Sequence, residues 1–424
     1  MSIEHIERNA ESRIAEHRMG DFRVRLTDQS GEPVAGAKVE IELERHDFRL
    51  GANGFKIRSC EMRDNPVDES LVLEYEDRFA KLMNYATLPF YWGSYEPVPG
   101  EENTERLRTM AEWCQNHDVH AKGHPLAWHE VFPAWAEKKD DEEVVQLLRN
   151  RIGRIVRDFQ GLVDTWDVFN ETTVAGSFDN AVGRWVRKRG SAACVEETLA
   201  LAREANPEAE LLYNDYNVSG DFERLVEELL ERKAPIDAIG IQSHMHKDIW
   251  SAEQLWETCE TYAQFGLPLH FTELTILSGR QKADGDNDWH RRRTDWPTTE
   301  EGERRQLKVG RRLYTLLFSH PAVDAVTWWD FSDYQAWQGA PAGLLREDMS
   351  PKPLAKWLHT AFADRWSTET QTRTDEDGEM RFHGFFGTYT IQVNGRRGER
   401  LTGKCTFPRR SGSSQDLSVS LSPG

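Results

Sequence analysis

The feature that most constrains the fold is an alternation of short apolar runs with amphipathic helical stretches between about residues 48 and 365. Strand-like runs that end in polar loops lie at 48–54, 84–90, 120–129, 165–170, 210–217, 236–246, 267–273 and 322–333. Stretches with helical spacing of apolar residues lie at 72–83, 104–117, 142–159, 194–206, 221–235, 251–266 and 301–320. This alternation is typical of βα units with a parallel sheet, and eight such units predict an α/β fold, a (β/α)8 TIM barrel.

The segments outside this alternation predict additional β structure. Residues 3–19 have a sparse helical spacing, and residues 21–45 alternate apolar and polar side chains around the turn QSGEPVAG, which predicts a β-hairpin. Residues 366–424 contain strand-like runs separated by glycine turns and predict a small β domain. We therefore expect three parts: 1–47 with a helix and hairpin, 48–365 with the barrel, and 366–424 with the β domain.

Two placements of the hairpin stay open. It either joins the C-terminal segment in one accessory β-sandwich or plugs the bottom of the barrel. The C-terminal segment lacks a tryptophan-rich face, so its aromatic residues suit a hydrophobic core as well as they suit sugar binding. These residues are Phe382, Phe385, Phe386 and Tyr389.

Composition narrows the classes of partner. The formal net charge of −19 disfavours nucleic acids and anionic membrane surfaces, because both are polyanions.

The N-terminus, MSIEHIERNAESRIAEHRMG, lacks the apolar core of a signal peptide, and no run approaches the ~18 apolar residues of a membrane span. The cysteines are scattered without a CxxC pair, which favours free thiols. We expect a cytoplasmic protein, or a secreted one if a leader was removed, and leave the oligomeric state open.

Two of the predicted strands end in a glutamate. The run TWDVFNE ends in Asn170 and Glu171, and the run LPLHFTE ends in Glu273. The separation of the two glutamates, 273 − 171 = 102 residues, holds three βα units of about 34 residues each, which places them on the fourth and seventh strands. Because barrels keep their chemistry at the carboxyl ends of the strands, both carboxyl groups are expected there. Such a pair suits glycoside hydrolysis.

Other side chains at the predicted strand ends suit a carbohydrate site. Aromatic faces stack on the CH surfaces of sugars, while amides and imidazoles hydrogen-bond their hydroxyls. The candidates are His124, Trp128, His129, Asn170, Asn214, Asp215, Tyr216, Gln242, His244, His246, Trp329, Asp333 and Trp337. The runs HMH and HE leave a metal site open as a competing interpretation. Because no HExxH motif or cysteine partner accompanies them, we expect no metal and no cofactor.

Six runs, GHPLAWH, WDVFNE, LYNDYN, GIQSHMH, FTEL and WDFSDYQAW, resemble in order and spacing glycoside hydrolase family 10, the retaining endo-β-1,4-xylanases. The resemblance covers about residues 48–362. It implies that Glu171 is the acid/base and Glu273 the nucleophile, with carboxyl groups ~5–5.5 Å apart. Asn170 would hold the sugar 2-hydroxyl. The other substrate-binding residues that it implies, together with Tyr216 from the run LYNDYN, are His124, Trp128, Gln242, His244, Trp329 and Trp337.

One departure from the family pattern falls in the neighbouring glycone subsite. Family members usually carry there a glutamate, an asparagine and a lysine that grip the next sugar, and the matching residues are Thr87, Leu88 and Tyr91. We keep Thr87 and Tyr91 as candidate substrate-binding residues. Because the hydrogen-bonding capacity of this subsite is reduced, a different sugar or exo-like action stays open.

A second departure lies beside the expected nucleophile. The aspartate that family members carry two residues after it, which helps to orient the active-site imidazole, is Thr275 here, so we expect the ionisation of His244 and Glu273 to be tuned differently. The segment 278–299 is also too long for an ordinary βα loop and suits a lid or a leaving-group wall. Its arginines 291–293 either meet a substrate carboxylate or are solvated.

The sequence predicts a retaining glycoside hydrolase that cleaves β-1,4-linked xylan or xylo-oligosaccharides, so the expected partner is an oligo- or polysaccharide. Two alternatives stay open. One is a retaining β-glycosidase acting on another plant-type β-glycan, and the other is a non-catalytic carbohydrate-binding barrel.

Overall fold

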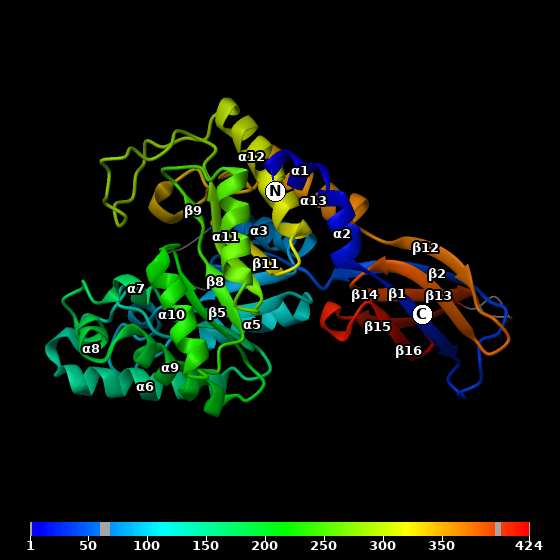
Figure 1. The fold of residues 1–424 in the computed structure, drawn as a ribbon, viewed down its shortest axis with the longest axis horizontal. Coiled ribbons are helices and arrows are strands. Elements are labelled where there is room, and N and C mark those ends of the chain that lie inside the picture. Colours follow the sequence, from blue (N-terminus) through cyan, green and yellow to red (C-terminus); the bar gives the residue numbers. More distant parts are fainter. Residues whose placement is uncertain (1, 60–67, 395–399, 424) are drawn as a thin grey trace. The chain divides into compact units, whose positions relative to one another are not determined.

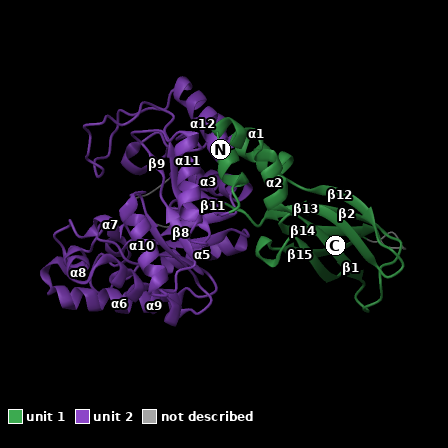
Figure 2. Ribbon diagram, in the orientation of Figure 1, with its two compact units in different colours: residues 1–49, 314–321, 356–424 green, residues 50–313, 322–355 purple. Residues whose placement is uncertain are grey.

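The computed structural model describes residues 2–59, 68–394 and 400–423, and the chain divides into two compact units. Figure 2 shows one unit made of residues 1–49, 314–321 and 356–424, and another made of residues 50–313 and 322–355. Stretches 314–321 and 356–365, which belong to the range predicted for the barrel, group with the β-rich unit.

The larger unit is built on a closed parallel barrel of eight strands. They follow one another around the barrel in chain order, and β11 closes it by pairing with β10. The strands are β3 (Arg49–Asn53), β4 (Tyr85–Pro89), β5 (His120–His124), β6 (Thr165–Asn170), β7 (Glu210–Asp215), β8 (Ala238–Ile241), β10 (Leu269–Ile276) and β11 (Val323–Trp328). The short strand β9 (His244–Met245) pairs with the end of β10. The predicted TIM barrel is confirmed.

A helix follows each barrel strand in the chain. Figure 1 labels these helices. These helices are α3 (Glu69–Leu82), α5 (Thr104–Asn116), α6 (Asp141–Asp158), α9 (Ser191–Ala205), α10 (Gly220–Glu231), α11 (Ala252–Ala263), α12 (Glu300–Ser319) and α13 (Pro353–Thr360). Helix α10 shows why they form. Its buried residues Phe222, Leu225, Val226 and Leu229 recur at helical spacing and line one face.

Several short helices lie outside these eight. Helix α8 (Ala181–Arg189), which was not predicted, and the short α7 (Thr172–Ala175) interrupt the long connection between β6 and α9, and α4 (Trp92–Tyr95) follows β4. The single helix predicted at 3–19 is two helices, α1 (Ile3–Arg8) and α2 (Ala10–Arg18), which meet at Asn9.

The smaller unit contains two sheets. One has the order β13-β1-β16 and the other β12-β2-β14-β15-β17. Their strands are β1 (Met19–Thr27), β2 (Lys38–His46), β12 (Glu369–Arg373), β13 (Glu379–Phe385), β14 (Gly387–Asn394), β15 (Arg400–Phe407), β16 (Ser414–Ser420) and β17 (Ser422–Pro423). Each sheet thus combines a strand from the N-terminal segment with strands from the C-terminal segment.

The predicted hairpin between residues 21 and 45 is wrong. Strand β1 pairs with β13 and β16, whereas β2 pairs with β12 and β14 in the other sheet. The alternation of apolar and polar residues reported correctly that both segments are strands with one buried face. The alternation carries no information about which strand each segment pairs with. Here each segment pairs with residues more than 300 positions away.

The two sheets pack through aromatic side chains. The ring of Phe22 on β1 stacks on Phe407 of β15 with centroids 4.0 Å apart, and Phe382 on β13 meets Tyr389 on β14 at 5.1 Å. Tyr389 is fully buried, and Phe382, Phe385 and Phe386 are at most 9% exposed. These aromatics therefore form the core of a β-sandwich, which confirms their structural interpretation.

Two further findings concern the whole described chain. No helix within residues 2–59, 68–394 and 400–423 is long and apolar enough to cross a membrane. Cys114, Cys194, Cys259 and Cys405 are buried free thiols. Cys60 lies outside the described residues.

Candidate active site

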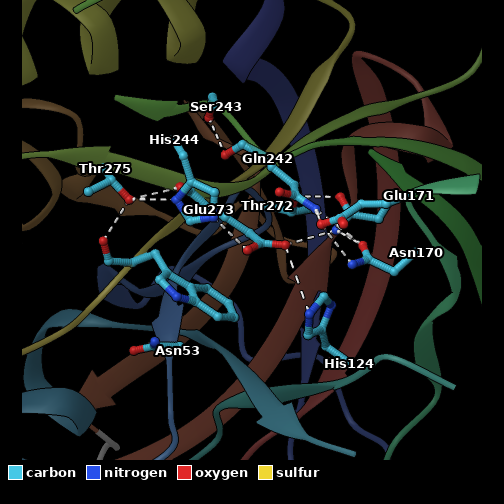
Figure 3. Close-up of polar contacts among 12 residues, drawn as sticks. Asn53, His124, Asn170, Glu171, Gln242, Ser243, His244, Thr272, Glu273 and Thr275 are labelled. Atoms are coloured by element: carbon cyan, nitrogen blue, oxygen red, sulfur yellow. Dashed lines mark hydrogen bonds and ion pairs between the residues drawn. The ribbon is translucent and has the colours of Figure 1, made fainter. Parts of the chain in front are cut away.

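The carboxyl ends of the barrel strands bring the predicted polar residues together. Figure 3 shows Glu171 and Glu273 facing a common centre, with His124 and Gln242 beside them. Asn170 is the last residue of β6 and Glu171 follows it, while Glu273 lies within β10. Because β6 and β7 pair with Asn170 opposite Asn214, the amides of neighbouring strands also meet here.

Glu171 is surrounded by uncharged donors. The indole of Trp128 donates to one carboxyl oxygen at 3.0 Å, and the amides of Gln242 and Asn170 donate to the other at 2.6 and 3.1 Å. Burial raises the pKa of Glu171 to about 8, against the hydrogen bond from Gln242 and assisted by the negative charge of Glu273. Glu171 is therefore protonated at neutral pH and holds a proton to donate.

Glu273 has a positively charged environment instead. The Nε2 atom of His244 lies 2.9 Å from one oxygen, and the amide of Asn214 donates to the other at 2.9 Å. Nε2 of His124 is 3.9 Å from the second oxygen. Burial acts to raise the pKa of Glu273, but the hydrogen bond from His244 and the charges of His124, His244 and Lys122 together lower it. Glu273 is therefore an ionised carboxylate.

Asn214 connects the surroundings of the two glutamates. Its amide nitrogen donates to Asn170 Oδ1 at 2.9 Å as well as to Glu273, and its oxygen accepts from the hydroxyl of Thr272 at 2.6 Å. Because the oxygen of Asn170 is used as an acceptor, its amide nitrogen faces Glu171. The orientation of Asn170 is thereby determined.

The sequence analysis missed a buried charged pair behind His124. Lys122 Nζ and His124 Nδ1 lie 2.6 and 2.8 Å from the same oxygen of Asp167, and the side chains of Lys122 and Asp167 are fully buried. This contact orients the imidazole of His124 toward Glu273. A signal was present, since Lys122 and Asp167 are charged residues inside predicted barrel strands, where burial requires a partner.

Thr275 occupies the position expected from the sequence. Its hydroxyl lies 3.0 Å from Nδ1 of His244 and 2.8 Å from the carbonyl of Trp329. Thr275 therefore holds the imidazole whose other nitrogen contacts Glu273, and it does so without adding a charge.

The aromatic candidates surround this centre. The ring of Trp329 lies 5.7 Å from that of His124, and the ring of Trp337 lies 5.2 Å from that of His244. Tyr216 is 47% exposed, and burial together with the charge of Glu171 raises the pKa of its phenol. The structure thus gathers the predicted tryptophans and Tyr216 near the glutamates.

The two candidates at the divergent subsite differ. The ring of Tyr91 lies 5.4 Å from His124 and 5.8 Å from Trp128, so it belongs to the site. Thr87 is 0% exposed, and its buried hydroxyl has no hydrogen-bond partner among the described residues. Thr87 has no surface that a substrate can touch, so its assignment as a substrate-binding residue is wrong. The reason is its position inside β4, where a side chain this short stays beneath the surface.

The histidine that a metal site would need is already engaged by protein side chains. His244 is engaged by Glu273 and Thr275, and its ring lies 5.4 Å from that of His246. Within the described part of the chain, no group of three or more His, Cys, Asp or Glu side chains is arranged to hold a metal ion.

The segment 278–299 packs against the candidate site. The ring of Trp289 stacks on Trp337 with centroids 6.0 Å apart, and buried Lys282 donates to the side-chain oxygen of Gln338 at 3.2 Å. Arg293 forms an ion pair with Asp286 of the same segment. Arg291 and Arg292 are exposed, as the solvated interpretation of the arginine run expects.

Comparison with known proteins places these residues in a family. The sequence profile of Glycosyl hydrolase family 10 matches residues 66–361. The chain is similar to endo-1,4-beta-xylanase B of Thermotoga neapolitana, with 28% identity over 277 residues, which are 62% of this chain and 75% of that protein. It is also 30% identical over 265 residues to endo-1,4-beta-xylanase A of Caldicellulosiruptor saccharolyticus, covering 58% and 74% of the two chains.

A third relative and one solved structure add to this. Anti-sigma-I factor RsgI6 of Acetivibrio thermocellus is 24% identical over 392 residues, covering 91% of this chain and 46% of that protein. The structure of xylanase 10B from Thermotoga petrophila RKU-1 in complex with xylobiose superimposes with a TM-score of 0.61 at 22% identity. The match covers 75% of this chain and 95% of that chain, and at this identity it bears on the fold alone.

Proposed function

Because the chain belongs to glycosyl hydrolase family 10, and is therefore a glycosidase, we propose that it cleaves β-1,4-linked chains of xylose with retention of configuration. The observation that carries the proposal is the pair of buried glutamates in contrasting surroundings, with Glu171 among an indole and two amides and Glu273 beside the imidazole of His244. The pKa of Glu171 is raised and that of Glu273 is lowered in these surroundings. A double displacement requires a proton donor and a nucleophile in the states that these shifts favour.

In the first step, Glu273 forms a bond to the anomeric carbon while the bond from that carbon to the leaving oxygen breaks. The leaving oxygen takes the proton of Glu171. In the second step, water attacks the anomeric carbon, Glu171 accepts the proton of that water, and the ester bond to Glu273 breaks. The released sugar has the configuration that it had in the substrate.

The same glutamate must first donate and then accept a proton. The negative charge of Glu273 is one of the causes that raise the pKa of Glu171. When Glu273 becomes an ester this charge disappears, so the pKa of Glu171 falls and Glu171 becomes a base. The contacts of Asn170 and Gln242 with Glu171 keep the carboxyl group in place through both steps.

A reducing-sugar assay over xylan, xylo-oligosaccharides, β-glucans and aryl β-glycosides tests the proposal. We expect turnover of the xylose-based substrates. If these stayed intact while another β-glycan was cleaved, the xylose assignment would fall and the glycosidase mechanism would stand. Proton NMR of the first product distinguishes retention, which gives the β-anomer first, from inversion.

A specific observation keeps a second candidate substrate in view. Of the three residues that replace the glutamate, asparagine and lysine of the neighbouring subsite, Thr87 and Leu88 are fully buried, and Tyr91 is aromatic. A site altered in this way suits a retaining β-glycosidase acting on another β-linked glycan. The substrate panel above separates the two candidates.

A non-catalytic carbohydrate-binding barrel is the alternative of another class. It requires no difference in ionisation between two buried carboxyl groups. It would be supported if Glu273→Ala and the wild-type protein bound oligosaccharides equally and neither hydrolysed any substrate of the panel.

A further inference from the structure

Four aromatic side chains at or just after the carboxyl ends of four different barrel strands form a closed ring of contacts beside the candidate nucleophile. They are Phe55, Tyr91, His124 and Trp329, and we call them the aromatic wall. The ring centroid of Tyr91 lies 6.0 Å from that of Phe55 and 5.4 Å from that of His124. The ring centroid of Trp329 lies 5.7 Å from that of His124 and 5.0 Å from that of Phe55, which closes the ring. All four pairs meet edge to face, at separations typical of aromatic rings in contact.

The aromatic wall adjoins both carboxyl groups. Its member His124 lies 3.9 Å from Glu273. The ring of Tyr91 is 5.8 Å from that of Trp128, whose indole donates to Glu171. Burial, followed by the charges of Glu273 and Glu171, raises the pKa of the Tyr91 phenol well above its usual value, which agrees with its place beside them. Rings in direct contact leave no gap between them for a sugar.

The wall stands where the resemblance to xylanases predicts the subsite of the next glycone sugar. Thr87 and Leu88, at the positions of the glutamate and asparagine of that subsite, are 0% exposed. Tyr91, at the position of the lysine, fills space with its ring and contacts Phe55 and His124. None of the three offers the charged or amide groups that would hold a second sugar.

A second element bridges the same face of the barrel. The segment 278–299 leaves β10, stacks Trp289 on Trp337 and brings His290 within 3.5 Å of Glu130. Glu130 follows β5, which lies four strands away from β10 around the barrel. A loop anchored on opposite sides of the mouth obstructs a long polymer that would lie across it, whereas a chain end can still enter.

We propose that the aromatic wall closes the glycone side of the site, so that this enzyme is exo-acting and removes one sugar at a time from the non-reducing end of an oligosaccharide. The inference rests on the proposed function, because it takes Glu171 and Glu273 as the reacting groups. It specifies the substrate class as short chains with a free non-reducing end and makes Tyr91 a determinant of specificity.

Initial products from xylohexaose labelled at its reducing end test the proposal. An exo-acting enzyme first leaves labelled xylopentaose and unlabelled xylose. Labelled xylotriose and xylotetraose as the earliest products would overturn it. If no xylose-based substrate is cleaved, the proposed substrate fails separately, and the same experiment with the labelled hexasaccharide of the glycan that is cleaved still decides between exo and endo action.

Two variants test the wall itself. Tyr91→Ala opens it, and we expect the ratio of internal to terminal cleavage to rise by about tenfold or more, in line with the discrimination that pocket shape provides. Tyr91→Phe keeps the ring and is the matched control, so its product pattern should equal that of the wild type. An unchanged ratio in Tyr91→Ala would overturn the role of Tyr91.

A third variant keeps the test decisive if Tyr91→Ala does not fold. Trp289→Ala removes the contact of the 278–299 segment with Trp337 from an exposed loop. We expect kcat/KM to rise for longer substrates relative to xylobiose. Xylohexaose should still be cleaved at its terminal bond, because the aromatic wall is intact. Internal cleavage by this variant would show that the wall does not close the site.

Discussion

Glu171 and Glu273 are two carboxyl groups of nearly equal burial, 8% and 5% exposed, yet their surroundings shift the two pKa values in opposite directions. The donors around Glu171 are an indole and two amides, all uncharged. Those around Glu273 include the imidazole of His244, with His124 and Lys122 contributing positive charge. Burial raises the pKa of both groups, so the charge of the neighbours decides which one ionises.

The difference teaches that the roles of acid and nucleophile depend on residues behind the visible site. Lys122 and Asp167 are fully buried and cannot reach a substrate, yet Asp167 fixes His124 and Lys122 adds positive charge near Glu273. Among the described residues, the main causes that set the pKa of Glu171 include no cation. Four changes test this contrast, beginning with the largest expected effect.

Removal of the proposed nucleophile should abolish the first step of the proposed mechanism. We expect Glu273→Gly to lower kcat by about 10⁴-fold or more, as for other covalent nucleophiles. Azide should restore turnover by attacking the anomeric carbon directly and should give the α-glycosyl azide. Steady-state kinetics and NMR of the azide product provide the measurement. A β-azide would mean that Glu273 is not the nucleophile.

The effect of removing the proposed acid should depend on the leaving group of the substrate. Glu171→Ala is expected to lower the rate on xylo-oligosaccharides by about 10³-fold, within the range of general acid catalysis, and to affect far less a dinitrophenyl glycoside, whose leaving group needs no proton. The alkaline limb of the wild-type profile, near pH 8, should disappear, since Glu171 must be protonated to donate. Equal losses on both substrates would contradict the assignment.

The buried charged pair should tune Glu273. The charge of Lys122 lowers the pKa of Glu273, so Lys122→Met should raise it. Because the proposed mechanism requires Glu273 as a carboxylate, the acid limb of kcat/KM should then move to higher pH, by about one unit for an interaction of ~1.4 kcal/mol. Stability should fall by about 3–5 kcal/mol, since a buried partner is removed.

Lys352→Met is the matched control for this change. Lys352 is also fully buried and lies 2.6 Å from the carboxylate of Asp333. It should lose similar stability without shifting the acid limb, because the pKa of Glu273 shows no contribution from it among its main causes. Equal shifts in both variants would mean that the limb reports general destabilisation.

The smallest effect is expected from Thr275. Thr275→Val removes the hydroxyl that contacts His244 and keeps the shape of the side chain. We expect kcat/KM to fall by about tenfold, the cost of a lost hydrogen bond of ~1.4 kcal/mol. Thr275→Ser should remain close to the wild type. If valine and serine behaved alike, the hydroxyl would have no role in positioning His244.

Sequence reasoning reached the barrel and the site through local signals. The runs that end in Glu171 and Glu273 combine apolar strands with abrupt polar ends. The number of residues between the two glutamates indicates how many βα units separate them. The pairing of β1 with β13 and the burial of Thr87 left no such signal. Both depend on contacts between residues far apart in the sequence, which periodicity does not encode.

The most direct test separates the two glutamates chemically. An activated 2-deoxy-2-fluoro-β-glycoside of the cleaved sugar slows the second step and traps the glycosyl-enzyme, which peptide mass spectrometry can locate. We predict one label per chain, on the carboxylate of Glu273, and none in Glu273→Gln. A label on Glu171, or no covalent intermediate together with an α-anomeric first product, would contradict the assignment of Glu171 as acid and Glu273 as nucleophile.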